Sequence, residues 1–131
     1  MNDRVSFWTK ASPYLLSILR IFTGFLFMPH GAEKLLGVFG GTRVPLMSLM
    51  GFAGVLELFG GLLILIGLAT RPVAFILAGE MAFAYFMAHN PAGFWPILNG
   101  GTMAVMFCFV FLYLSSAGAG PWSVDRLLRR R

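Results

Sequence analysis

Six ionisable side chains interrupt stretches of the chain that are otherwise almost entirely apolar. They are three acids, two bases and a histidine, namely Arg20, His30, Glu33, Lys34, Glu57 and Glu80. A charge in apolar surroundings is unfavourable, so each of these groups needs a partner, a cavity or water beside it. Neighbouring groups can tune the pKa values of such carboxyl and imidazole groups. The set therefore indicates a proton or redox-ligand site, or alternatively a network of ion pairs that holds helices together.

The polar residues of the first apolar stretch share one face of a helix. At about 100° per residue, they fall within an arc of about 140°. These residues are Arg20, Thr23, His30, Glu33 and Lys34. Leucine and phenylalanine occupy the opposite face, as contact with lipid requires. Glu57 and Glu80 lie near the middle of the next two stretches. We expect their partners to come from the first helix.

The composition requires a membrane to surround these elements. Hydrophobic types make up 58% of the 131 residues and charged types 11%, too few charges to cover the surface of a soluble domain. A spanning helix needs about 20 mostly apolar residues. Four stretches meet or approach this length, at residues 14–37, 46–68, 72–89 and 97–116, and Ser12 and Pro13 are suited to the start of the first. The sequence predicts one all-α membrane domain over residues 1–131, an antiparallel bundle of four transmembrane helices.

The basic residues predict how this bundle is oriented. Seven lie on one side of the predicted membrane, namely Arg4, Lys10, Arg71, Arg126, Arg129, Arg130 and Arg131, whereas Arg43 and Lys34 lie toward the other. Because Lys and Arg accumulate on the cytoplasmic side, we expect both termini in the cytoplasm and a multi-pass protein of a bacterial-type plasma (inner) membrane. We expect the lipid bilayer to surround the bundle. We expect no nucleic-acid partner.

Several alternative chemistries find little support. Cys108 is the single cysteine, so no internal disulfide or cysteine-based metal cluster is expected. We expect neither a metal site nor a covalently bound cofactor. His30 and His89 differ in predicted depth, which disfavours a haem held between them. The glycines around Glu57, together with Gly24 and Gly31, indicate closely packed helices.

Taken together, these residues and motifs resemble the DoxX family of small four-helix membrane proteins, from about Leu19 to Asp125. His30-Gly31 with Lys34 is similar to the family's HGxxK, and Glu57 with Gly60-Gly61 to its ExxGG. The segments 67–71 and 118–125 resemble its GLxTR turn and its closing GxGxWSxD. Glu80 and His89 fall where the third helix of the family carries polar residues, and Asn99-Gly100-Gly101 resembles the start of its fourth. Many relatives have an acid where this chain has Thr102.

The resemblance implies function only broadly. Some DoxX proteins are the membrane subunit of a thiosulfate:quinone oxidoreductase, and others are linked to complexes that manage oxidative or thiol stress. It thus implies a redox-complex subunit, with a quinone as its cofactor and a protein partner or a homo-oligomer. We name as candidate ligand or proton-site residues His30, Glu33, Lys34, Glu57, Glu80, Arg20, His89 and Asn99. Two alternatives are a non-catalytic scaffold that recruits a partner and a small proton-coupled transporter. Whether the chain is an enzyme is left open.

Overall fold

The computed structural model describes residues 3–129, and every regular element in that range is helical. The long helix α1 spans Asp3–Leu36. A second helical rod consists of α2 (Leu49–Val55), the π-helical η1 (Leu56–Gly60) and α3 (Gly61–Ile66). A third consists of α4 (Thr70–Ala84), the π-helical η2 (Tyr85–His89) and the short 3-10 turn η3 (Asn90–Ala92). The chain closes with α5 (Pro96–Asn99), α6 (Thr102–Ala117) and α7 (Val124–Arg129).

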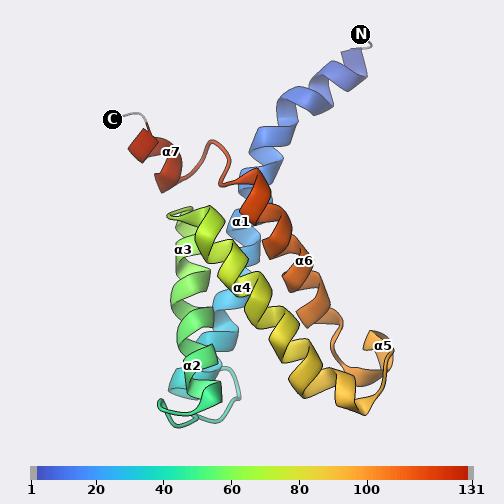
Figure 1. The fold of residues 1–131 in the computed structure, drawn as a ribbon. Coiled ribbons are helices and arrows are strands. Elements are labelled where there is room, and N and C mark those ends of the chain that lie inside the picture. The colour runs from blue at the N-terminus through green and yellow to red at the C-terminus, as the bar shows by residue number, and fades with distance from the viewer. Residues whose placement is uncertain (1–2, 130–131) are drawn as a thin grey trace.

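Successive rods run antiparallel, and the start of α1 and helix α7 lie toward the same end of the molecule (Figure 1). Three helical rods of the described chain, Asp3–Leu36, Leu49–Ile66 and Thr70–Ala92, are long and apolar enough to cross a membrane. The apolar helix α6, Thr102–Ala117, is shorter. An all-helical membrane protein is therefore confirmed, whereas a count of four crossings and the side on which the termini lie stay predictions. Arg130 and Arg131, which belong to the predicted basic side, lie outside the described residues.

Several helix limits differ from those predicted. The first helix begins at Asp3 rather than near residue 14, so Pro13 lies inside it and Ser12 is not its cap. A proline inside a helix has no backbone N–H, so the hydrogen bond to the carbonyl four residues earlier is missing. The helix α1 continues past Pro13 despite this missing bond. The fourth span begins at Thr102 rather than at residue 97, because Gly100, with φ 76°, ends the single turn of α5.

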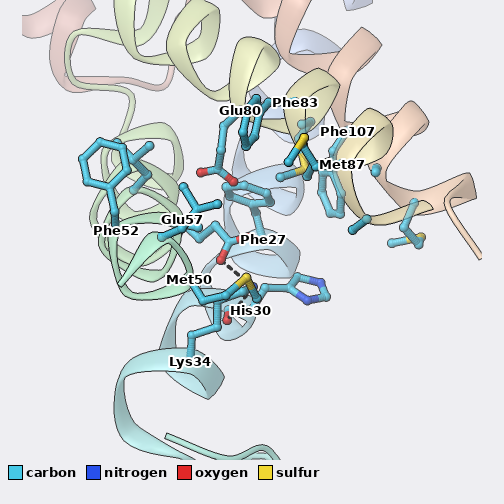
Figure 2. Close-up of a pocket in the computed structure, with 18 of the residues that line it drawn as sticks. Phe27, His30, Lys34, Met50, Phe52, Glu57, Glu80, Phe83, Met87 and Phe107 are labelled. Atoms are coloured by element: carbon cyan, nitrogen blue, oxygen red, sulfur yellow. Dashed lines mark hydrogen bonds and ion pairs between the residues drawn. The ribbon is translucent and has the colours of Figure 1, made fainter. Parts of the chain in front are cut away.

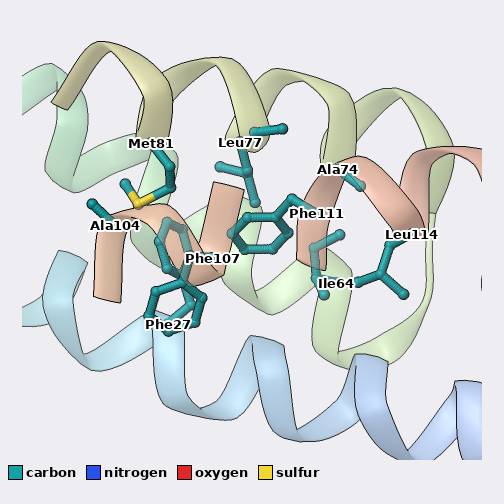
Figure 3. Packing of buried hydrophobic residues seen from close by; sticks show 10 residues of the cluster. Phe27, Ile64, Ala74, Leu77, Met81, Ala104, Phe107, Phe111 and Leu114 are labelled. Carbon is teal, nitrogen blue, oxygen red and sulfur yellow. The ribbon is translucent and has the colours of Figure 1, made fainter. Parts of the chain in front are cut away.

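The core lies where α1, α3, α4 and α6 meet. Its aromatic centre is formed by Phe27, Phe107 and Phe111 (Figure 3). The ring centroid of Phe27 lies 5.1 Å from that of Phe107 and 4.9 Å from that of Phe111. Ile64 and Leu77 pack around these rings, and both are almost fully buried. This cluster fixes the relative positions of the helices that carry the polar residues.

Glycines allow α1 to approach the second rod backbone to backbone. A Cβ atom at Gly24 would lie 2.6 Å from the Leu65 nitrogen, and one at Gly31 would lie 2.6 Å from the Gly54 carbonyl oxygen. No side chain fits in such a space. The prediction of close packing at these glycines is confirmed, and it brings the end of α1 directly against η1.

The outward faces of the helices are apolar. Large side chains more than half exposed occur on every long helix, among them Phe22, Phe52, Phe75, Phe83 and Phe109. Soluble monomers rarely expose so much apolar surface. Lipid is the environment that covers it.

Candidate ligand pocket between the helices

A pocket of about 550 Å³ opens between α1, the second rod, α4 and α6. Its walls are mainly aromatic rings and methionines, including Phe27, Phe52, Phe83, Phe107, Met50 and Met87 (Figure 2). Five ionisable residues interrupt these walls: His30, Lys34, Glu57, Glu80 and His89. An apolar cavity of this size with a few convergent polar groups is the usual form of a small-molecule site.

An ion pair between Lys34 and Glu57 lines the pocket. The Lys34 Nζ atom lies 2.7 Å from Glu57 Oε2, and the two side chains are 20% and 6% exposed. Lys34 Nζ also lies 3.4 Å from the backbone carbonyl of His30. Glu57 belongs to the π-helical segment η1, where the helix is locally widened. The close approach of Gly31 brings this segment within reach of the lysine.

Glu80 projects from α4 into the same pocket (Figure 2). Its Oε1 oxygen is fully buried and has no hydrogen-bond partner among the described residues. Glu57 already has the Lys34 ammonium as its partner. The pocket therefore contains two carboxyl groups and a single lysine, which is bound to Glu57.

The two histidines lie at different positions in the pocket wall. The His30 ring packs edge-on against Phe107, with centroids 6.1 Å apart. His89 ends the π-helical η2, and its Nδ1 atom lies 3.1 Å from the Asn99 carbonyl oxygen. One ring nitrogen of His89 is therefore oriented by the backbone. The ring as a whole lines the pocket.

Asn99 shapes the loop that follows His89 without lining the pocket itself. Its Nδ2 atom donates to the Gly93 carbonyl at 2.9 Å and to the Tyr85 hydroxyl at 3.2 Å, and its Oδ1 accepts from the Gly101 nitrogen at 2.8 Å. The Tyr85 hydroxyl in turn donates to the Phe94 carbonyl at 2.9 Å. Sequence reasoning missed Tyr85, because a tyrosine among apolar residues carries no signal of such a bond. Thr102 is exposed at the start of α6.

Arg20 and Glu33 are not part of this pocket. Arg20 is almost fully buried, and its guanidinium donates to the backbone carbonyls of Ile64 at 2.9 Å, of Trp122 at 2.6 Å and of Ala119. The sequence left open which acid Arg20 pairs with, and in the structure its guanidinium binds backbone carbonyls instead. Carbonyls at helix ends lack partners, and the planar fork of an arginine can bind several of them. Glu33 packs instead on Gly41, in the loop after α1.

The closing segment 118–125 has a structural role at the end of the bundle where the termini lie. Asp125 Oδ1 accepts from the Ala69 nitrogen at 2.8 Å and Oδ2 from the Thr70 nitrogen at 2.9 Å, so the carboxylate caps α4. Partial burial by itself raises the pKa of Asp125. These hydrogen bonds and the nearby Arg129 lower the pKa by more than burial raises it, so it lies below its ordinary value.

Within residues 3–129, no three histidine, cysteine or acidic side chains are placed to hold a metal ion together. The pocket has the character of a site for an organic molecule. Its walls suit an apolar body, and its polar groups suit a few directed contacts.

Comparison with known families agrees with this architecture. A family model described as DoxX matches residues 15–90, more than half of the chain and the part that holds every ionisable residue of the pocket. The chain belongs to the DoxX family. It is a multi-pass membrane protein of this family, as the sequence indicated.

Relatives in several bacteria share most of the chain. A Haemophilus influenzae protein whose name states no function is 41% identical, over 88% of this chain and 92% of its own length. The inner membrane protein YqjF of Escherichia coli is 32% identical, over 87% and 92%. CatD of Bacillus subtilis, whose name proposes an oxidoreductase, is 38% identical over 82% of both chains. No solved structure matches this DoxX protein.

Proposed function

We propose that this DoxX protein is an integral membrane subunit of a redox complex and that its pocket holds a quinone ring. The observation that carries the proposal is the pocket of about 550 Å³, whose apolar walls enclose the Lys34–Glu57 pair and Glu80. Pockets that bind small molecules have volumes of about 300–1,000 Å³. The name of the relative CatD supports a redox setting.

The chemistry of the pocket suits this ligand. A quinone has a flat apolar ring, which fits between aromatic and methionine side chains, and two carbonyl oxygens that accept hydrogen bonds. The Lys34 ammonium is a donor beside the ring, and its partner Glu57 keeps it in place. Reduction of a quinone takes up protons along with electrons. Glu80 and His89, which also line the pocket, are groups that can deliver them. The electrons come from a partner protein in this proposal.

The proposed setting is the bacterial inner membrane, with four crossings and both termini in the cytoplasm. The predominance of Lys and Arg on one side supports this orientation. The name of the relative YqjF supports the inner membrane. The electron-donating partner would then approach from either side or pack against the exposed helix faces.

Quinone binding to the purified protein tests the proposal. The protein in lipid nanodiscs is titrated with decylubiquinone and with a short-chain menaquinone, and quenching of tryptophan fluorescence is followed. We expect saturable binding, weakened about tenfold or more in Glu57→Gln, because an uncharged partner no longer holds the ammonium as strongly. Glu33→Gln is the matched control, since Glu33 lies outside the pocket. Absence of saturable binding, or equal affinity in both variants, contradicts the quinone site and favours a scaffold.

A further inference from the structure

We propose that the same pocket binds a hydrophobic organic cation, with Glu80 as its counter-ion, in exchange for a proton. This goes beyond the proposed function, because a quinone is neutral and leaves the charge of the pocket unchanged. The inference rests on the charges that line the pocket, on the unpartnered oxygen of Glu80 and on the chemistry of the walls.

The charges in the pocket do not balance when both carboxyl groups are ionised. Lys34 is bound to Glu57 at 2.7 Å, and the other titratable groups that face the pocket are Glu80 from α4, His30 from α1 and His89 from η2. Arg20 is held by backbone carbonyls elsewhere. The Glu57 and Glu80 carboxyl groups are close enough to interact, and two neighbouring carboxylates that share one lysine in apolar surroundings are strongly unfavourable when both are ionised. The pocket therefore retains one more positive charge, which is a proton on a carboxyl group until another cation replaces it.

Glu80 is the carboxyl group on which this exchange takes place. Glu57 has its lysine, whereas Glu80 Oε1 is buried and has no hydrogen-bond partner in the part of the chain that the structure describes. In Figure 2 the Glu80 carboxyl group points into the space between α4 and the second rod. A cation in that space would lie beside the Glu80 carboxyl group.

The walls select an organic cation over a hydrated metal ion. Phe27, Phe52, Phe83 and Phe107 line the pocket, and the faces of aromatic rings attract cations. Methionine side chains add polarizable and adaptable contacts. A small inorganic ion would lose its water shell without gaining enough oxygen ligands. A bulky cation with its charge spread over apolar groups loses little on entry and gains both kinds of contact.

Tetraphenylphosphonium is a suitable probe, and tetraphenylborate has the same shape with the opposite charge. Equilibrium dialysis of the full-length protein in nanodiscs, against empty nanodiscs, measures the binding of each ion at pH 6, 7 and 8. We expect one tetraphenylphosphonium per chain, with an affinity that rises up to about tenfold per pH unit as one proton is displaced. Tetraphenylborate should show no saturable binding. Glu80→Gln should lower the affinity at least tenfold and abolish its pH dependence, whereas Glu33→Gln should behave as wild type.

A second measurement needs no variant. Addition of tetraphenylphosphonium to wild-type protein in weakly buffered solution should acidify it, by at most one proton per bound cation. Equal binding of the two ions, an unaltered affinity in folded Glu80→Gln protein, or binding without proton release at every pH would overturn the proposal. If decylubiquinone binds and the cation does not, this inference fails while the proposed function stands. If the cation binds and decylubiquinone does not, the proposed quinone site fails while the cation site stands.

Discussion

Single charged residues inside this bundle serve two different purposes. Arg20 and Asp125 bind backbone groups at helix ends, at the end of the molecule where the termini lie. Lys34, Glu57 and Glu80 face the pocket. The sequence alone did not show which charged residues bind the backbone and which face the pocket. Residue type and helical phase do not reveal whether a backbone carbonyl or a carboxylate lies opposite an arginine.

Asp125 gives a prediction about stability and pH. Its pKa is lowered from the ordinary 3.8, so its ionised form stabilises the fold above about pH 4, and this contribution is lost as the pH falls through the lower folded-state pKa. Asp125→Asn removes a charged cap from α4 and should cost about 0.5–2 kcal/mol at pH 6. Thermal unfolding in detergent should show that the variant is less stable than wild type at pH 6, and that this difference in stability shrinks toward pH 3. The exposed Asp3→Asn serves as control, and a deficit independent of pH would contradict the assignment.

At the scale of helices, the pocket depends on how closely α1 approaches the second rod. Gly24 and Gly31 permit backbone contact there, and both π-helical segments carry a pocket residue, Glu57 in η1 and His89 in η2. A π-helical turn changes which residues of a helix face the same way. Hydrophobic periodicity assumes a regular helix, so the sequence could not predict how either residue would point.

Gly31→Ala tests this dependence. The added methyl group would meet the Gly54 carbonyl oxygen at 2.6 Å, so the helices must separate. Such overpacking should destabilise the protein by about 1–3 kcal/mol, and it should also weaken decylubiquinone binding by moving Lys34 away from Glu57. Gly79→Ala is the matched control, because nothing lies within 4 Å of its added methyl group. That control should be neutral or gain up to about 1 kcal/mol in helix propensity. Similar losses in both variants, by unfolding in SDS, would count against close packing.

For the whole molecule, composition and apolar segment lengths were enough to predict an all-helical membrane protein. The limits of the segments were not, because Pro13 continues a helix that it was expected to start and Gly100 breaks one expected to be continuous. Five of the candidate residues line the pocket, since residues this unfavourable in lipid must turn inward. Their pairing depends on relative depth and rotation, which follow from the packing of glycines and phenylalanines and cannot be obtained from one helix at a time.

The number of membrane crossings is the remaining property of the whole chain that an experiment can decide. At 16 residues, α6 is about 24 Å long, short of the roughly 30 Å of a hydrocarbon core. Its two ends nevertheless lie at opposite ends of the bundle. Arg20 ties Ala119 and Trp122, just beyond α6, to Ile64 near the end of α3, whereas Asn99, just before α6, is tied to Tyr85. Because α6 runs alongside α4, from Arg71 near the start of α4 to Tyr85 just after its end, we expect it to cross.

Reporter fusions distinguish four crossings from three. Green fluorescent protein at the C-terminus should be fluorescent, and alkaline phosphatase at the same position should be inactive, because four crossings and the basic residues near both ends place the termini in the cytoplasm. Phosphatase inserted after Gly93, in the loop between η3 and α5, should be active and is the control for export. Active phosphatase at the C-terminus, with a cytoplasmic N-terminus, would mean that α6 lies on the membrane or re-enters it. The pocket wall that Phe107 provides would then need a different explanation.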